Sequence, residues 1–179
     1  MATMPANSHL NGEARFSPCQ RYRYVLTRWW GSTRSIAFVL LNPSTATAHQ
    51  DDPTIRRCIA FARQWDYQRL IVLNLFARRT ARPRDLFQAD DPIGPDNDRT
   101  IQEFAASVDC VVAGWGVNGA FARRDQDVLR LLPKKLHCLR LTNAGFPAHP
   151  LYLPASTLPM AWQPQHDAPD GQGVSAARS

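Results

Sequence analysis

Residues 36–46 read IAFVLLNPSTA, and this stretch decides the predicted fold. Its apolar first half is an unbroken run of strand length, which is typical of a strand covered on both faces in a parallel α/β sheet. Pro43 ends the strand, because proline lacks a backbone N–H and keeps the preceding Asn42 out of the helical region. We therefore expect Asn42 and Ser44 just past the carboxyl end of a strand, where open α/β sheets usually bind ligands. A plain strand-to-loop turn would give the same local pattern.

The rest of the chain alternates between strand and helix patterns. Apolar or alternating runs predict strands over residues 21–30, 36–41, 70–76, 108–113 and 136–141. Helical periodicity predicts helices over residues 51–67, 96–107 and 118–132. The alternation from residue 36 onward predicts an α/β fold, a three-layer α/β/α sandwich with a mostly parallel central sheet.

The predicted folded unit is a single α/β domain over residues 19–162. Residues 1–18 and 163–179 are polar and lack periodicity, so they are predicted to be disordered tails. Residues 31–33, GST, predict a hairpin-like turn between the first two strands.

The positive charge of the chain comes almost entirely from arginine. The 179 residues carry a net charge of +6, and only Lys134 and Lys135 of the 21 basic residues are lysines. The planar fork of arginine suits phosphate and carboxylate better than the point charge of lysine. The composition is therefore compatible with a nucleic acid or nucleotide as partner, although a solvated basic surface has the same composition.

Several other classes are excluded by what the sequence lacks. No apolar run approaches the roughly 18 residues of a membrane span, and residues 1–17 lack the apolar core of a signal peptide. The sequence therefore predicts a cytoplasmic protein with no membrane partner. The four cysteines have no zinc-ligand spacing, so we expect no metal, and Cys58, Cys110 and Cys138 are predicted core residues. Without a GxGxxG, Walker or G-x-S-x-G motif, no cofactor is expected.

Polar residues also end the later strands. Asn74 interrupts the run over residues 70–76, and a buried amide must be hydrogen-bonded, so Asn74 is either a structural clamp or a ligand contact. The edge that it shares with Asn42 favours the ligand contact. His149 lies in a proline-bounded loop after the last strand, where no regular structure requires an imidazole. That position favours a functional role for His149.

Two groups of charged residues have open roles. Residues 77–84 place four arginines, including Arg78 and Arg79, in a loop that either is solvated or faces phosphate. Asp51 and Asp52 precede a helix, so they are either caps or catalytic carboxylates, and capping explains at least one of them.

The blocks LNPSTA, NLFARRT, PIGPDND, GWG and HPLYLP resemble a family of small bacterial and phage proteins catalogued as a domain of unknown function. This resemblance covers nearly all of residues 21–160. More remotely, the same blocks are similar in order to those of the uracil-DNA glycosylase superfamily. The remote resemblance implies an α/β/α fold and metal-independent cleavage of the N-glycosidic bond of a flipped base.

The remote resemblance also implies roles for individual residues. Asn42 resembles the residue that positions the attacking water, and His149 resembles the histidine that stabilises charge on the departing base. Asn74 resembles the asparagine that recognises the base. Phe76 and Trp115 are the candidates for base stacking, since no aromatic residue clearly matches that position.

Two departures from the superfamily change the expectation. Asn42 stands where the fast uracil enzymes carry aspartate, and an amide can orient a water but cannot accept its proton, so weaker activity is expected. Leu151 and Tyr152 replace the Ser-Pro that follows the superfamily's His-Pro, and either side chain could still insert into the minor groove.

The sequence leaves three functions open. The first is an N-glycosidase acting on a base in nucleic acid, with Asn42 and His149 as catalytic residues. Its predicted substrate contacts are Ser44, Asn74, Phe76, Arg78, Arg79, Trp115, Leu151 and Tyr152. The alternatives are a hydrolase of a free or modified nucleotide and a non-catalytic nucleic-acid-binding module. Salt separates a nucleic acid from a mononucleotide, because binding of a duplex weakens steeply as salt rises.

Overall fold

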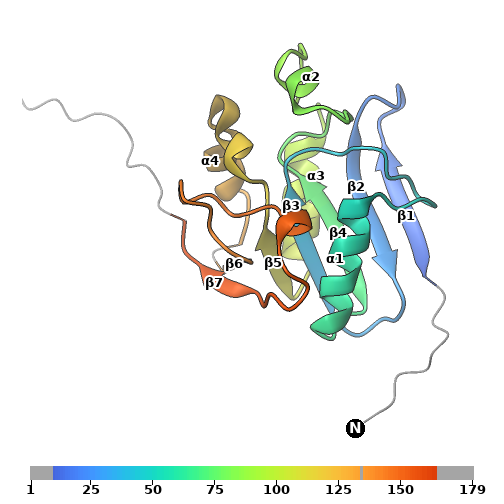
Figure 1. Ribbon diagram of the computed structural model, residues 1–179. Coiled ribbons are helices and arrows are strands. Elements are labelled where there is room, and N and C mark those ends of the chain that lie inside the picture. Colours follow the sequence, from blue (N-terminus) through green and yellow to red (C-terminus); the bar gives the residue numbers. More distant parts are fainter. Residues whose placement is uncertain (1–9, 134, 165–179) are drawn as a thin grey trace, which may run out of the picture.

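The computed structural model describes residues 10–133 and 135–164, which form a seven-stranded sheet with helices on both faces (Figure 1). The strands are β1 (Asn11–Phe16), β2 (Arg23–Trp29), β3 (Ser35–Leu40), β4 (Arg69–Asn74), β5 (Cys110–Ala113), β6 (Leu136–Cys138) and β7 (Met160–Trp162). The α-helices are α1 (Pro53–Gln64), α2 (Pro83–Phe87), α3 (Asn97–Ala106) and α4 (Arg124–Leu129), and the 3-10 helices are η1 (Val117–Arg123) and η2 (Pro150–Tyr152).

The sheet is mixed, with strand order β1-β2-β4-β3-β5-β6-β7. The four central strands, β4, β3, β5 and β6, are parallel to one another. The outer pairs β1–β2, β2–β4 and β6–β7 are antiparallel. The prediction of a mostly parallel sheet is therefore right only for the centre of the sheet. The predicted hairpin at residues 31–33 is wrong, because β4 lies between β2 and β3.

Two apolar clusters fill the two faces of the sheet. On one face α1 packs on alternate strand residues, with Ile59 of the helix and Phe38 of β3 in the same cluster. On the other face α3 and α4 cover the remaining set, with Ile101 and Val39 together. Successive β3 residues point to opposite faces, as the pleat of a strand requires. Burial on both faces explains why the run at residues 36–41 has no polar residue.

The N-terminus of α1 forms as the sequence predicts. Asp52 is the N-cap, and its carboxylate accepts the backbone N–H of Ile55 at 2.9 Å, with Pro53 as the first helical residue. Capping is therefore the role of Asp52 at this helix. The loop before α1 and the segment containing α2 lie together beyond the carboxyl ends of β3 and β4, at the top of Figure 1. We call this end of the sheet the carboxyl edge.

β1 lies in a segment that the sequence assigned to a disordered tail. Among the described residues it pairs with β2 alone, which leaves one of its edges unpaired there, and its residues are alternately exposed and half-buried. An edge strand of this kind has no apolar run that would reveal it. The prediction of disorder over residues 1–18 is therefore wrong for residues 11–16. Residues 1–9 and 165–179 of the two predicted tails lie outside the described residues.

The helix predicted over residues 118–132 is broken in two. Ala122 and Arg123 have φ angles of 52° and 56° between η1 and α4, and residues in this left-handed region interrupt a right-handed helix. The last predicted strand, residues 136–141, is also shorter than expected, since β6 ends at Cys138.

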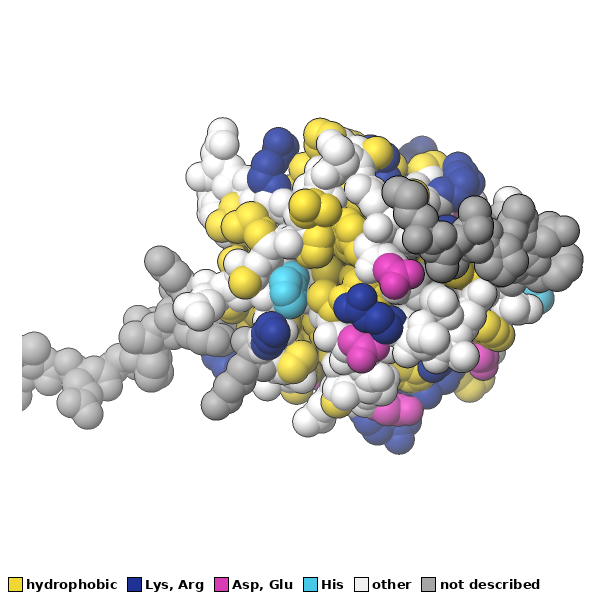
Figure 2. Space-filling view, turned by 90° about the horizontal axis from the view of Figure 1, so that it is seen from below, with side chains coloured by type: hydrophobic (Ala, Val, Ile, Leu, Met, Phe, Trp, Pro, Cys, Tyr) yellow, Lys and Arg dark blue, Asp and Glu magenta, His cyan; other side chains and the backbone are white. Residues whose placement is uncertain are grey.

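The burial of the cysteines agrees with the sequence prediction. Cys58, Cys110 and Cys138 are buried free cysteines, as predicted, whereas Cys19 is exposed. Figure 2 shows the side opposite the carboxyl edge, where basic and acidic side chains lie next to one another.

Within the described ranges, the structure has no helix with both the length and the apolar character needed to cross a membrane.

Candidate functional site

A cavity of about 500 Å³ opens at the carboxyl edge, between the loops that follow β3, β5 and β6. We call it the edge cavity. Six of the residues predicted from the sequence line it: Asn42, Ser44, Trp115, His149, Leu151 and Tyr152. They come from segments more than 100 residues apart, from Asn42 after β3 to Tyr152 in η2. Both predicted catalytic residues therefore face one ligand-sized space.

Asn42 is held rigidly by its own side chain. Its amide nitrogen donates to the backbone oxygens of Pro43 and Thr80, both at 3.0 Å. With both amide protons used, the side-chain oxygen remains as the group that can accept a hydrogen bond from a ligand or water. Two carbonyl oxygens at this position require a donor, so an aspartate would repel both. This geometry gives a physical reason for asparagine and not a carboxylate at position 42.

His149 presents a hydrogen-bond donor to the edge cavity. Its Nδ1 accepts the backbone N–H of Leu151 at 3.3 Å, so the neutral imidazole carries its proton on Nε2. Burial lowers the pKa of His149 below its usual value, and the Asp52 carboxylate opposes this shift only in part. At neutral pH the residue is therefore an uncharged donor.

The lowered pKa of His149 predicts that stability falls in mild acid. The unfolded chain takes up a proton on this residue near pH 6.5, whereas the folded protein does so only at lower pH, so the free energy of unfolding decreases as pH falls through that window. His149→Gln should make this decrease shallower. Urea unfolding of both proteins at about pH 7.5 and about pH 5 measures the difference. Equal decreases in the two proteins would contradict the assignment.

The wall and the mouth of the edge cavity are aromatic. Trp115 is 2% exposed and forms part of the wall, after β5 in the Gly-Trp-Gly segment. Tyr152 is 80% exposed at the mouth, and its ring lies 5.6 Å from the imidazole of His149. Leu151 lies beside it in η2. Trp115 is thus placed to contact a bound ring, and Tyr152 is placed to contact whatever lies outside the cavity.

Asn74 and Phe76 do not line the edge cavity, so the contacts predicted for them are corrected. The Asn74 side chain is 2% exposed, and its oxygen accepts a hydrogen bond from the Arg23 guanidinium at 3.5 Å. Phe76 is completely buried and packs on Phe121, with the ring centroids 5.9 Å apart. Of the alternatives left open for Asn74, the structure thus favours an internal clamp over direct contact with a ligand.

The predicted arginines Arg78 and Arg79 line a second cavity, of about 440 Å³, which adjoins the edge cavity. We call it the arginine cavity. Its walls are Gln20, Arg21, Ser44, Thr45, Arg78, Arg79 and Thr80. Ser44 and Thr80 line both cavities. A ligand with a ring in the edge cavity could therefore place a charged group in the arginine cavity.

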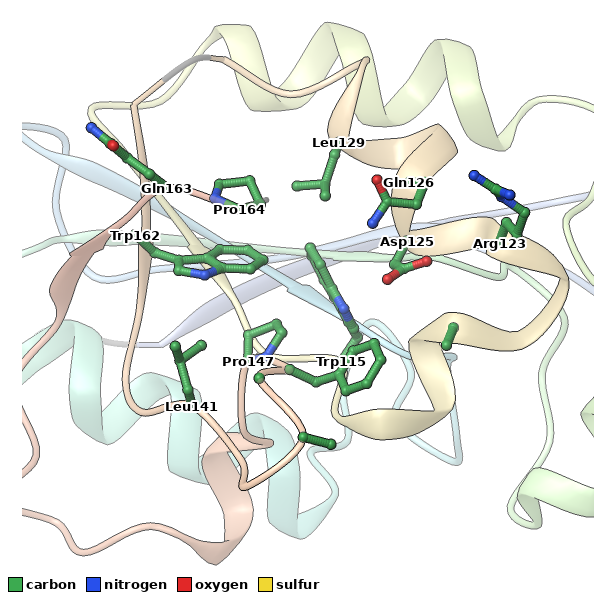
Figure 3. Close-up of a pocket in the computed structure, with 14 residues that line it drawn as sticks. Trp115, Arg123, Asp125, Gln126, Leu129, Leu141, Pro147, Trp162, Gln163 and Pro164 are labelled. Carbon is green, nitrogen blue, oxygen red and sulfur yellow. The ribbon is translucent and has the colours of Figure 1, made fainter. Parts of the chain in front are cut away.

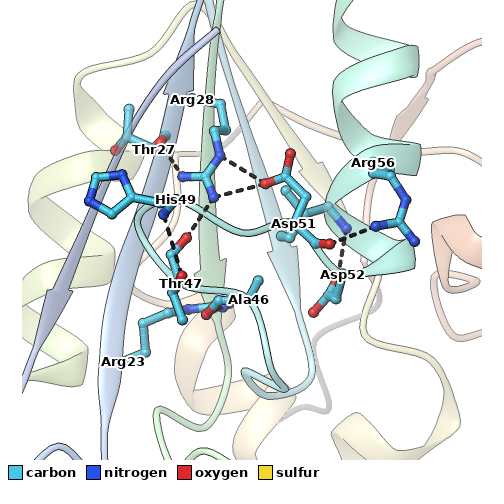
Figure 4. Close-up of polar contacts among 10 residues, drawn as sticks. Arg23, Thr27, Arg28, Ala46, Thr47, His49, Asp51, Asp52 and Arg56 are labelled. Carbon is cyan, nitrogen blue, oxygen red and sulfur yellow. Dashed lines mark hydrogen bonds and ion pairs between the residues drawn. The ribbon is translucent and has the colours of Figure 1, made fainter.

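Two arginines of β2 hold the loop between β3 and α1 in place (Figure 4). Arg28 forms a buried ion pair with Asp51, at 2.8 Å, and also donates to the backbone oxygens of Thr27 and Thr47. Arg23 donates to the backbone oxygen of Ala46 at 3.1 Å. The Asp51 carboxylate is thus engaged in an ion pair, and Asp51 does not line the edge cavity.

A third cavity, of about 570 Å³, lies on the α4 side of the sheet (Figure 3). Trp115 and Trp162 form two of its walls, with their ring centroids 5.7 Å apart. Apart from Trp115, it contains none of the residues predicted for the site. The part of the chain that the structure describes contains no group of three His, Cys, Asp or Glu residues arranged to hold a metal ion.

Five polar residues of the edge cavity were not predicted: Thr54 in α1, Thr80 in the loop after β4, and Asn118, Arg140 and Thr142. Asn118 follows the Gly-Trp-Gly segment, and Arg140 and Thr142 follow β6. In the sequence, Asn118, Arg140 and Thr142 share one signal, a position just past a strand end. Many ordinary loop residues have the same position. Only the packing of the loops distinguishes them.

The fold and its cavities define an α/β protein with a ligand-sized site at the carboxyl edge of a mixed sheet. Over residues 23–151 the sequence matches the family described as "Protein of unknown function (DUF1643)", and the chain belongs to this family. The resemblance to a family of unknown function is thereby confirmed. No curated protein and no solved structure matches the chain significantly. The matched segment contains all of the edge-cavity wall except Tyr152 and Leu153.

Proposed function

We propose that the protein is an N-glycosidase that removes a base from nucleic acid, with an arrangement like that of the uracil-DNA glycosylases. One observation carries the proposal. Asn42 and His149, both held by backbone hydrogen bonds, line the same cavity, and a cavity lined by arginines adjoins it. A nucleotide unit could place its base in the edge cavity and its phosphate near the arginine cavity.

The bond cleaved joins the base nitrogen to the sugar carbon. As this bond breaks, the electron pair moves onto the base, and the Nε2–H of His149 stabilises the charge developing on it. The Asn42 oxygen orients a water for attack on the sugar carbon. Because an amide cannot accept the proton of that water, the proton leaves to solvent or to the departing base, and the reaction is slow.

Other edge-cavity residues hold the base. Trp115, which forms part of the cavity wall, would contact the ring, and contacts between aromatic side chains and bases tolerate any base. Asn118 lines the same cavity and offers a donor and an acceptor for the base edge, the role that the sequence suggested for Asn74. The base reaches the cavity by rotation out of the stack.

Base release from short DNA strands tests the proposal. Single- and double-stranded DNA carrying uracil, hypoxanthine or a mismatch is incubated with the protein, and abasic sites are detected by strand cleavage. Release of one base supports the proposal. If no base is released but the same DNA binds in a salt-sensitive way, a non-catalytic binding module replaces it. If neither occurs, the free-nucleotide alternative replaces it.

Tyr152→Ala is expected to reduce base release from duplex DNA about tenfold and to leave release from single strands nearly unchanged. The ring is exposed at the cavity mouth, where it can fill the space left by a flipped base, and only a duplex needs that support. Leu158→Ala removes another exposed apolar side chain away from both cavities and serves as the control. Equal losses on both substrates would exclude a role in flipping.

A further inference from the structure

Three nitrogen atoms near the arginine cavity are buried and have no hydrogen-bond partner among the described residues: Arg23 Nε, Asn74 Nδ2 and Arg79 Nε. Arg79 lines the cavity, and Arg23 and Asn74 lie beneath the loop that contains its Ser44 and Thr45. Buried polar groups without partners are costly and therefore rare in folded proteins. Three donors without acceptors at one place indicate a site that is completed by an acceptor from outside.

Arg23 differs from the other buried arginines in its partners. Arg28 is paired with Asp51, and Arg124 is paired with Asp98. Arg23 is 2% exposed, yet within the described ranges it forms no ion pair with a carboxylate. Its hydrogen bonds go to a backbone carbonyl and to the amide of Asn74. Its positive charge therefore has no ion-pair partner, and the Asp52 carboxylate offsets it only in part.

The position of Arg23 is built into β2. The pairing of β1 with β2 passes over Tyr24, so a β-bulge lies next to Arg23. Bulges of this kind redirect a side chain from one face of a sheet to the other. Burial lowers the pKa of Arg23 to about 10, so the guanidinium still carries its charge at neutral pH.

The arginine cavity itself has the composition of an anion site. Arg21, Arg78 and Arg79 line it with the hydroxyl side chains of Ser44, Thr45 and Thr80, and no carboxylate is among its lining residues. In contrast, acidic and basic side chains lie next to one another on the opposite side of the molecule (Figure 2). Arginine and hydroxyl groups are the side chains that bind phosphate oxygens in proteins.

We infer that the arginine cavity is a phosphate subsite, in which Arg79 and Arg78 contact the phosphate of a nucleotide unit and Arg23 adds a buried positive charge beneath it. The phosphate would supply the ion-pair partner that Arg23 lacks among the described residues. Ser44 and Thr80 connect this subsite to the edge cavity, so that phosphate and base belong to one ligand. That the ligand is a nucleotide unit rests on the proposed function, whereas phosphate binding does not.

Binding of inorganic phosphate to the full chain, measured by isothermal titration calorimetry, tests the inference. Arg79→Gln and Arg23→Met should each weaken the binding at least about tenfold, because each removes a charged donor or a nearby charge. Arg69→Gln is the matched control. It removes the same charge from the exposed, opposite end of β4 and should leave the affinity unchanged.

Arg23→Met also separates a binding role from a structural one. Arg23→Met removes hydrogen bonds to Ala46 and Asn74, but it also removes a buried charge that has no ion-pair partner, so the thermal midpoint of the ligand-free protein should fall much less than that of Arg28→Met. A protein that does not bind phosphate, or variants that bind it as tightly as Arg69→Gln, would overturn the inference. A marked fall in the midpoint of Arg23→Met with normal phosphate binding by Arg79→Gln would also overturn it.

Competition identifies the source of the phosphate. A nucleoside monophosphate that displaces inorganic phosphate, when the nucleoside alone does not, identifies a terminal phosphate. Displacement only by a single-stranded oligonucleotide, with a steep dependence on salt, identifies a backbone phosphate. The two proposals fail separately. Phosphate binding without base release would support the phosphate subsite and contradict the N-glycosidase proposal. Base release at the parental rate by a variant that does not bind phosphate would support the N-glycosidase proposal and contradict the subsite.

Discussion

Replacing Asn42 with alanine is expected to lower the rate of base release about 100-fold or more. The side-chain oxygen is the only group that the proposed mechanism assigns to the attacking water, and positioned groups of this kind contribute on the order of 100-fold to 10,000-fold. The rate is measured in single turnovers on DNA that carries the released base, so that substrate binding does not mask the chemical step.

Two further variants make the result for Asn42 specific. Asn143→Ala removes an exposed amide that does not itself line the edge cavity, although its loop does, and this variant should release base at the parental rate. His149→Ala should lose about 100-fold to 1,000-fold, as expected for removal of one donor to a developing anion. Circular dichroism confirms that the variants are folded. Parental rates for either Asn42→Ala or His149→Ala would show that the chemistry takes place elsewhere.

Arg28→Met is expected to lower the free energy of unfolding by about 3 to 5 kcal/mol, the range found when a buried ion pair loses one partner. The guanidinium is 2% exposed and Asp51 is 17% exposed. Without Arg28, the carboxylate keeps its charge in a half-buried position, and two backbone oxygens lose their donor. Urea unfolding measures the loss.

Arg130→Met provides the comparison for this stability prediction. Arg130 pairs with Asp127 at the same 2.8 Å separation, but both side chains are more than half exposed. Exposed pairs contribute about 0 to 1 kcal/mol, so the loss should be small. Similar losses for the two variants would mean that burial does not determine the contribution of Arg28. A large loss for Arg28 alone would identify the loop before α1 as dependent on this ion pair.

The central part of the fold can be predicted from the sequence because its signals are local. The apolar runs of β3 and β4 and the Asp-Pro start of α1 each have a direct physical cause, burial on two faces or capping. Strand direction and order are not local. Nothing in the sequence of β2 shows that β4 will lie between it and β3. The break at Ala122 is also hidden, since alanine usually favours a helix.

The candidate site was predictable to the extent that it follows strand ends. Asn42 and His149 each lie beyond a strand end, and the loops carry both to one cavity. Asn74 ends β4 and satisfies the same rule, but it is buried and accepts a hydrogen bond from Arg23 of the neighbouring β2, next to a bulge in the β1–β2 pairing. That contact depends on strand order and on an irregular register. A polar residue at a strand end therefore indicates well that the residue lies at the carboxyl edge of the sheet. It indicates poorly whether the side chain faces the cavity or the interior.

The outermost strands of the sheet lie outside the segment that defines the family. The family match covers residues 23–151, whereas β1 and β7 lie before and after it. These two short strands occupy the free sides of β2 and β6. If the chain were trimmed to the shared segment, the unpaired backbone groups of both inner strands would face solvent and could pair with other molecules. β1 and β7 thus cover the outer sides of β2 and β6, so that the free edges of the sheet belong to strands outside the shared segment.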